Sequence, residues 1–178
     1  HYQTTPADDW DYTATQHIIL ADLELGGEKR KVLMQAPKNG FFYVLDRVTG
    51  ELLSADRYIP ATWATHVDMK TGRPVETPEA SYSRETRLII PAPFGGHNWH
   101  PMAYNPRTGL VYIPAMQPMG IYPLSQDFKA TGKYERRDLF WNLGIDWGVW
   151  YDTVGALMQN HLVLVCCHLI CWVRGDIP

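Results

Sequence analysis

The sequence predicts an all-β protein. Three observations lead to this class: seven tryptophans and ten tyrosines in 178 residues, two strand–turn–strand units of similar sequence, and no stretch with convincing helical periodicity. Aromatic and β-branched side chains fit a pleated, half-buried surface, and tryptophan and tyrosine need broad packing with a polar edge. The overall composition is that of a globular protein whose length suffices for one sizeable core.

The first expected strand pair lies close to the amino terminus. Residues 17–25 (HIILADLEL) and 31–35 (KVLMQ) combine branched and long aliphatic side chains with charges, and Gly26-Gly27 stands between them. Two such runs joined by glycines are typical of a β-hairpin with a tight turn. We therefore predict a hairpin here.

A second strand pair follows directly. Residues 40–46 (GFFYVLD) are rich in aromatic and β-branched side chains, residues 47–50 (RVTG) read as a turn, and residues 51–55 (ELLSA) read as the returning strand. Residues 102–115 repeat this order of strand, turn and strand, with a turn closed by Thr108-Gly109. Units about sixty residues apart are what radially repeated sheets produce, so the residues fit a β-propeller, and they fit an ordinary β-sandwich with two similar hairpins equally well.

Two stretches between these units are expected to be irregular. Residues 57–83 and 117–133 are rich in proline and polar residues, and neither shows a clear strand pattern. Loops of such length in a compact domain are uncommon, and they are usually functional or cover a neighbouring surface. Residues 160–173 are nearly all apolar, but they are too few for a membrane helix, which needs about twenty residues.

Charge and cysteine content exclude several classes of function. The formal net charge is −3, and the basic residues are scattered, so no nucleic-acid footprint exists. The three cysteines, Cys166, Cys167 and Cys171, lack zinc-ligand spacing and the C-x-x-C-H order of a haem attachment. No signal-peptide pattern precedes His1, so a secretion signal of a parent protein would lie outside this chain.

An acidic and aromatic cluster near the start is the first candidate for chemistry. Asp8, Asp9 and Asp11 surround Trp10, and Lys38 follows in a segment that looks like a hairpin strand. A carboxylate beside a large aromatic ring can be tuned as a general base, and a nearby cation could share its ligand. The alternative is that Asp11 caps a turn and Lys38 is a solvated loop charge, since functional acids are a minority.

Three stretches of the chain resemble the PQQ-dependent (pyrroloquinoline quinone) alcohol dehydrogenases, in the order of that family. They are residues 10–16 (WDYTATQ), 36–55 (APKNGFFYVLDRVTGELLSA) and 95–115 (GGHNWHPMAYNPRTGLVYIPA). The resemblance implies an eight-bladed propeller, of which residues 1–147 would be a section of about three blades. Residues 148–178 are expected to be a divergent apolar tail, from a truncated or frameshifted reading frame. The chain is thus identified as an internal fragment of such an enzyme.

The same resemblance assigns roles to four residues. Asp11 would be the catalytic base that takes the proton of the alcohol, and it would also be a calcium ligand. Lys38 would place its cation against the quinone oxygens, while Asn98 and Trp99 would contact the cofactor. A carboxylate, a cation, an amide and an indole are suited to deprotonating an alcohol and binding a flat polar heterocycle.

Other polar residues near these motifs are expected to be structural. We interpret Asp8 and Asp9 as loop or turn acids, although they are the fallback candidates for the base. His97 and His100 flank Asn98 and Trp99 but supply no third metal ligand, so structural hydrogen bonds are expected for both.

The resemblance also predicts cofactors, partners and location. Thr13 stands where lanthanide-using relatives carry a second aspartate, so calcium is expected, with its glutamate and asparagine ligands preceding His1. The expected reaction is oxidation of a primary alcohol to an aldehyde in the periplasm, with PQQ as hydride acceptor and cytochrome c or a quinone as electron acceptor. The wording of residues 97–101 and 140–148 indicates the quinohaemoprotein branch, in which a haem c domain would lie elsewhere in the full-length protein.

Two further expectations concern the molecule as a whole. The chain alone is expected to be inactive, and membrane association would come through partner proteins. The alternative function is a non-catalytic propeller that serves as a binding or assembly scaffold, which explains the repeated turns but not Asp11, Lys38 and Asn98 together.

Overall fold

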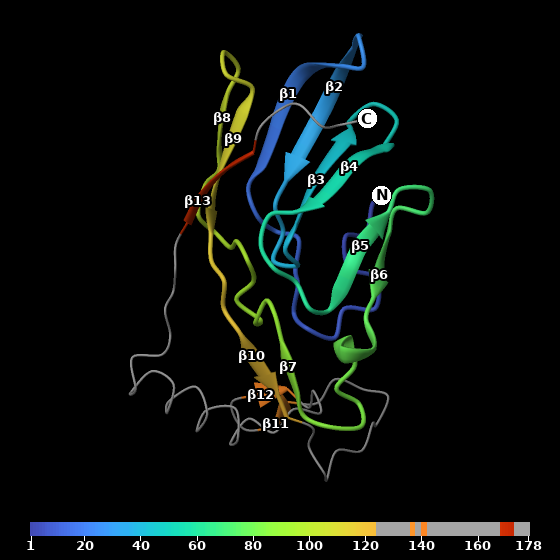
Figure 1. Ribbon diagram of the computed structural model, residues 1–178, viewed down its shortest axis with the longest axis vertical. Coiled ribbons are helices and arrows are strands. Elements are labelled where there is room, and N and C mark those ends of the chain that lie inside the picture. Colours follow the sequence, from blue (N-terminus) through green and yellow to red (C-terminus); the bar gives the residue numbers. More distant parts are fainter. Residues whose placement is uncertain (124–135, 138–139, 142–167, 173–178) are drawn as a thin grey trace.

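The central element of the fold is a four-stranded antiparallel meander (Figure 1). The computed structural model describes residues 1–123, 136–137, 140–141 and 168–172. Its first hairpin turns at Gly26-Gly27, where both glycines have positive φ, and its last turns at residues 47–50. Both predicted strand pairs are therefore confirmed, within one sheet. Its strands are β1 (Ile18–Leu25), β2 (Glu28–Gln35), β3 (Phe41–Asp46) and β4 (Leu52–Arg57).

A second sheet confirms the third predicted strand pair. Strand β8 (Ala103–Asn105) pairs with β9 (Leu110–Ala115), and β13 (His168–Trp172) pairs antiparallel with the other edge of β9. The apolar run 160–173 thus forms a strand over its last described residues, whereas Cys166 and Cys167 lie outside the described residues. The boundary at residues 147 and 148 also lies there and stays a prediction.

The expectation of irregular structure in residues 57–83 and 117–133 is wrong in part. The first contains the hairpin of β5 (Ala64–Asp68) and β6 (Arg73–Glu76), and the second contains β10 (Gly120–Tyr122), which pairs with β7 (Arg87–Ile89). These strands are short, and β6 carries a proline as an edge strand can, so they lack the alternation that marks longer strands. Residues 124–133 lie outside the described residues.

The remaining elements are small. A single 3₁₀ turn, η1 (Pro78–Ala80), is the one helical element in the part of the chain that the structure describes, and strands β11 (Arg136–Arg137) and β12 (Phe140–Trp141) form a two-stranded ladder. No helix within these ranges is long and apolar enough to cross a membrane. The all-β class is therefore confirmed.

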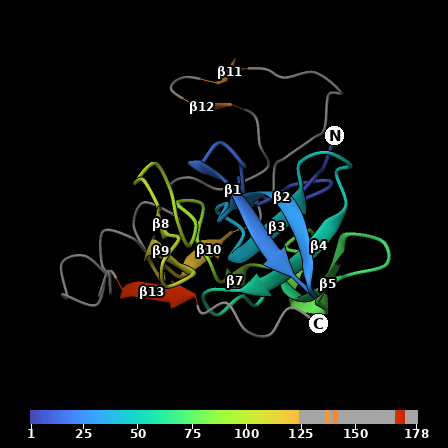
Figure 2. The same ribbon diagram turned by 90° about the horizontal axis from the view of Figure 1, so that it is seen from above.

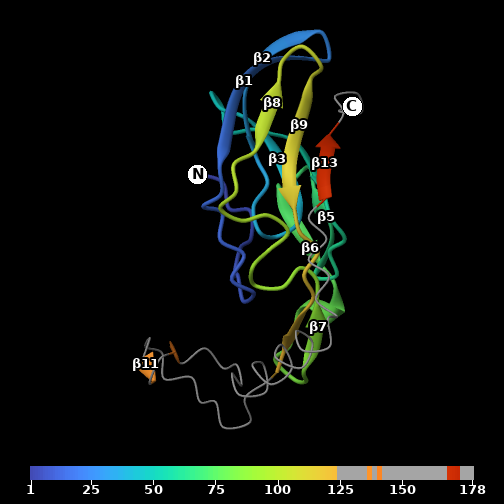
Figure 3. The ribbon, with the colours of Figure 1, turned by 90° about the vertical axis from the view of Figure 1, so that its left-hand side faces the viewer.

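Both faces of the central sheet are covered, which is how neighbouring blades of a propeller pack. Side chains on β3 alternate: Phe42 and Val44 join a core cluster with β8 and β9, while Phe41 and Tyr43 join a second cluster with Trp63 and β5. Seen from above, the sheet of β8 and β9 and the hairpin of β5 and β6 lie on opposite sides of the central sheet (Figure 2). From the side, β7 and β10 extend beyond the end of the stacked sheets (Figure 3).

Three hairpins share one turn design. In each, an aspartate or asparagine side-chain oxygen accepts hydrogen bonds from backbone N–H groups two or three residues later, and a glycine with positive φ closes the turn. The glycine N–H in turn donates to the carbonyl of the first residue at 2.7 to 2.8 Å. The turn between β5 and β6 has the same sequence pattern, with an aspartate first and a glycine last, so this pattern also indicated the hairpin of β5 and β6. The three pairs of first residue and glycine are Asp46 and Gly50, Asp68 and Gly72, and Asn105 and Gly109.

Replacing Asp46 and Asp68 together by asparagine is expected to flatten the pH dependence of the unfolding free energy. Backbone N–H groups, those of Thr49 and Thr71 first, hold the pKa of these two carboxyl groups below its usual value. A lowered folded-state pKa stabilises the fold above the unfolded-state pKa of about 3.9, and this contribution is lost as the pH falls through the folded value. Urea unfolding at about pH 7 and about pH 3 measures the difference.

The third turn shows that an amide can fill the same place, because Asn105 accepts the Arg107 N–H at 3.0 Å. The double variant should therefore keep its fold. Asp56→Asn, an exposed aspartate on β4, controls for the loss of charge. An unchanged pH dependence in the double variant would mean that the turn carboxylates do not contribute as described.

Candidate functional site

Lys38, the predicted cation, lies in a loop whose backbone carbonyl groups all accept hydrogen bonds. Residues 36–40 connect β2 to β3, and the side chain of Lys38 is only 11% exposed. The interpretation of Lys38 as a solvated turn lysine is therefore wrong. Each carbonyl oxygen of the loop accepts a hydrogen bond from a distant residue, which fixes the backbone. The donors to carbonyls 36, 37, 38, 39 and 40 are, in order, His97 Nδ1 at 2.7 Å, Tyr58 Oη at 2.7 Å, Gly96 N at 2.9 Å, Trp63 Nε1 at 2.8 Å and Tyr58 N at 3.0 Å.

Asp11 and Lys38 meet, as the sequence predicts. Lys38 Nζ lies 3.1 Å from Asp11 Oδ2 and 3.0 Å from the Asp11 backbone oxygen. The lysine arrives from the interior, whereas the side chain of Asp11 is 64% exposed. One carboxylate oxygen is thus held by a cation, while the outer side of the group faces solvent and can meet a ligand.

Two buried aromatic rings fix the backbone of Asp11. Trp10 and Tyr12 are 3% and 1% exposed, and their rings stack at 5.6 Å with Trp63 packed against both. Trp10 Nε1 donates to the Ala80 carbonyl at 2.9 Å, and Tyr12 Oη donates to the Pro91 carbonyl at 2.5 Å. Asp11 between them has φ +65°, a left-handed conformation that is uncommon outside glycine but several-fold enriched in aspartate. The aromatic anchors therefore fix the backbone from which the exposed carboxylate of Asp11 extends.

The other two acids of the cluster serve the turn. Asp8 Oδ1 accepts the Trp10 N–H at 3.0 Å, and the Asp9 backbone oxygen accepts the Tyr82 hydroxyl at 2.5 Å. Partial burial raises the pKa of Asp8, against the lowering effect of hydrogen bonds from the Tyr12 and Trp10 backbones. These contacts agree with their interpretation as turn acids.

Gly95 and Gly96 bring the third sequence motif onto the Lys38 loop. A Cβ atom at Gly95 would lie 2.4 Å from Lys38 Cβ and 2.5 Å from Lys38 Cα, and the φ of Gly95 is +78°. Only glycine permits this approach. The glycine pair had not been singled out from the sequence, although it opens the motif. Tyr58 and Trp63 were also missed, since they lie in the stretch expected to be irregular.

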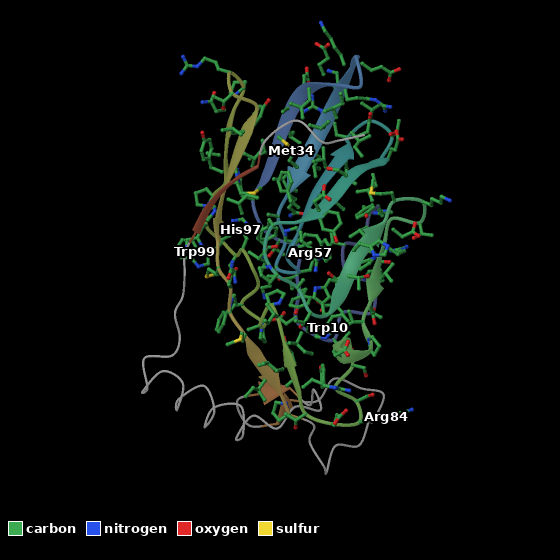
Figure 4. The ribbon with its side chains drawn as sticks, viewed as in Figure 1. Trp10, Met34, Arg57, Arg84, His97 and Trp99 are labelled. Carbon is green, nitrogen blue, oxygen red and sulfur yellow. The ribbon has the colours of Figure 1, made fainter. Side chains whose placement is uncertain are left out.

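Asn98 and Trp99 lie farther along the same segment. Asn98 Nδ2 donates to the Phe94 carbonyl at 2.9 Å, and Trp99 is 78% exposed and stacks on His100 at 4.0 Å. Among the described residues, no hydrogen bond or ring contact joins Asn98 or Trp99 to Asp11 or Lys38. The exposed indole face is available to a flat ligand, and Figure 4 shows Trp99 at the margin of the molecule, with His97 further inside. Their roles as cofactor contacts stay predictions.

Among the described residues, neither histidine of the motif belongs to a group that could hold a metal ion. His97 lies between two backbone carbonyls, and His100 Nδ1 is buried without a hydrogen-bond partner. Within the described ranges, no group of three or more histidine, cysteine, aspartate or glutamate side chains could hold a metal ion. Calcium takes six to eight oxygen ligands, so Asp11 could supply only one side of a calcium site.

The arrangement can therefore offer an outward carboxylate with a buried ammonium behind it. Three clefts in the described residues are lined by other parts of the chain, chiefly the amino terminus and the turns of β1 to β6. None of these three clefts is lined by Asp11 or Lys38, and the Asp11 side chain of the pair faces solvent. The pair fits a polar ligand with an exchangeable proton on the carboxylate side and partial negative charge on the ammonium side.

Comparisons with known proteins agree with the motifs. Residues 1–62 match the family model described as glucose/ethanol/alcohol dehydrogenase, beta-propeller domain (PQQ). The quinohemoprotein alcohol dehydrogenase ADH IIB of Pseudomonas putida is 60% identical over 122 residues, which are 68% of this chain and 18% of the relative. The 1-butanol dehydrogenase (cytochrome c) of Thauera butanivorans is 55% identical over 152 residues, which are 82% of this chain and 21% of the relative.

A solved structure shows the same architecture. The structure of quinohemoprotein alcohol dehydrogenase ADHIIG from Pseudomonas putida HK5 aligns with a TM-score of 0.71 and 51% identity, over 81% of this chain and 21% of that one. The chain spans about a fifth of the length of the curated relatives it matches. The likeness supports the partial propeller over the sandwich.

Proposed function

We propose that this chain forms one side of a quinone site where a primary alcohol is oxidised to an aldehyde. The premise is that the chain is related in sequence and fold to a section of the PQQ-dependent alcohol dehydrogenases. The observation that carries the proposal is the contact of Lys38 Nζ with the outward carboxylate of Asp11, at 3.1 Å. Asp11 has a left-handed backbone, and non-glycine residues held in such conformations cluster at active sites and ligand clamps, which supports the proposal.

Asp11 is the proposed general base. Its Oδ2 is engaged by Lys38, while its Oδ1 makes no hydrogen bond to the described residues and is free to accept the hydroxyl proton of an alcohol. Removing that proton makes departure of the hydride from the alcohol carbon easier. PQQ, when bound, accepts this hydride.

Lys38 is proposed to hold and polarise the quinone. Two of the three ammonium donors point at Asp11, and the third is available to an oxygen of the ligand. A nearly buried cation stabilises negative charge more strongly than an exposed one. Asn98 and Trp99 would bind the same ligand through an amide and an indole face.

Calcium is the proposed metal, and Asp11 is its proposed ligand in this chain. Thr13 adds no charge beside Asp11, which agrees with a divalent hard cation rather than one that needs a further carboxylate. Cytochrome c or a quinone as acceptor, haem c in the full-length protein and a periplasmic location are proposed on the same resemblance. The name of the Thauera relative, which includes cytochrome c, supports the first of these.

A grafted enzyme tests the proposal. In it, residues of this chain replace the matching segment of ADH IIB of Pseudomonas putida, which supplies the remaining propeller. We expect the grafted enzyme to bind PQQ and to reduce it with ethanol, whereas the chain alone with PQQ and calcium should not. Binding of the quinone without alcohol oxidation would favour the scaffold function. Turnover by the chain alone would show that the other blades are not required.

A further inference from the structure

His97 is fully buried and lies between two backbone carbonyl oxygens. Its Nδ1 is 2.7 Å from the Ala36 oxygen, and its Nε2 is 2.7 Å from the His100 oxygen. Both distances are short for a nitrogen donor, and both partners are acceptors only. A neutral imidazole has one N–H, so it would turn the lone pair of its other nitrogen toward a carbonyl.

We infer that His97 is a positioning residue that donates from both ring nitrogens, as an imidazolium, and thereby ties the Lys38 loop to the Asn98–Trp99 segment. Ala36 lies two residues before Lys38, and His100 follows Trp99 directly. The doubly protonated ring satisfies both carbonyls through charge-assisted hydrogen bonds. The role in the quinone site rests on the proposed function.

Backbone hydrogen bonds of Gly96 make a second connection beside the His97 ring. Gly96 N donates to the Lys38 carbonyl at 2.9 Å, and the Gly96 carbonyl accepts the Met116 N–H at 2.7 Å. This connection sets the distance between the two backbones, but it ends before Asn98. The His97 ring reaches past it to His100, the residue that directly follows the two predicted cofactor contacts.

Nitrogen-15 NMR of the histidine rings in the full chain tests the protonation directly. We expect both ring nitrogens of His97 to give protonated-type shifts. His17 is the internal control, because its Nδ1 accepts the Met102 N–H at 3.2 Å and must be bare in the fold. The unprotonated Nδ1 of His17 should be visible in the same spectrum. An unprotonated ring nitrogen at His97 in that spectrum would overturn the inference.

Two substitutions in the grafted enzyme test the positioning role. In His97→Asn the amide can replace Nδ1 and keep only the bond to Ala36, and in His97→Gln it can replace Nε2 and keep only the bond to His100. Each should fold and lose about ten-fold in PQQ affinity, since one of the two ring hydrogen bonds is missing. His66→Asn and His66→Gln, at an exposed histidine, should leave the affinity unchanged.

The outcomes separate the two proposals. A grafted enzyme with His97 intact that binds no PQQ contradicts the proposed function and leaves the NMR result standing. Folded His97 variants with unchanged PQQ affinity overturn the positioning role. If circular dichroism shows that neither variant folds, the NMR spectrum of the unsubstituted chain tests the inference. An unprotonated ring nitrogen at His97 would then contradict it.

Discussion

Replacing Asp11 by asparagine in the grafted enzyme is expected to lower kcat by about 10² to 10⁴-fold while PQQ stays bound. The amide keeps the shape of the carboxylate and can still accept from Lys38 through its oxygen, but it cannot take up the alcohol proton. The backbone conformation should persist, because Trp10 and Tyr12 anchor it from both sides. Steady-state kinetics with ethanol, together with the absorbance of the bound quinone, measures the effect.

Asp9→Asn is the matched control for this change. Asp9 is exposed, and its structural contact is made by its backbone oxygen, so the substitution removes the same charge two residues away without touching the pair. Its kcat should stay within about two-fold of the unsubstituted grafted enzyme. Near-normal turnover of the Asp11 variant with PQQ bound would exclude this residue as the base.

Replacing Lys38 by methionine is expected to lower kcat by about 10² to 10³-fold and to weaken PQQ binding. Methionine retains an unbranched chain that can pack against Gly95, so the loss falls on the ammonium group and not on the packing. Lys38→Arg should recover part of the activity, since it restores a cation with a different geometry. Separate measurements of kcat, KM and PQQ affinity distinguish charge stabilisation from simple binding.

Lys31→Met provides the control for losing a lysine. Lys31 is exposed on β2, so its replacement should change neither kcat nor PQQ affinity. Urea unfolding of both variants shows whether an effect comes from a change in stability. We expect the unfolding free energy to change little, because the Asp11 side chain is 64% exposed in the pair. A Lys38→Met enzyme with full activity would mean that this cation has no part in the reaction.

The hairpins could be predicted because their turns carry strong local signals. Gly26-Gly27 and the two glycine-closed turns after Asp46 and Asn105 require backbone conformations that few residues adopt. The hairpin after β4 was missed although Asp68 and Gly72 carry the same turn, because its strands are short and largely polar. Short strands are defined by pairing with distant residues, and sequence periodicity does not contain that information.

The candidate site could be predicted only in part. The residues alone left open whether Asp11 and Lys38 meet, and the family resemblance favoured it. Burial of Lys38 depends on donors that come from three separate stretches, and no local pattern reports such long-range hydrogen bonds. The close approach of Gly95 to Lys38 likewise exists only in the folded chain.

The bonded loop of residues 36–40 also bears on which sequences the site can tolerate. All five donors address backbone oxygens, which every amino acid provides, so the loop shape does not depend on the side chain at position 38. The close packing of Gly95 against Cα, Cβ and Cγ of Lys38 in turn requires glycine at position 95. Arginine, methionine or glutamine in place of lysine at position 38 is therefore expected to leave the loop backbone unchanged while it changes the chemistry of the site.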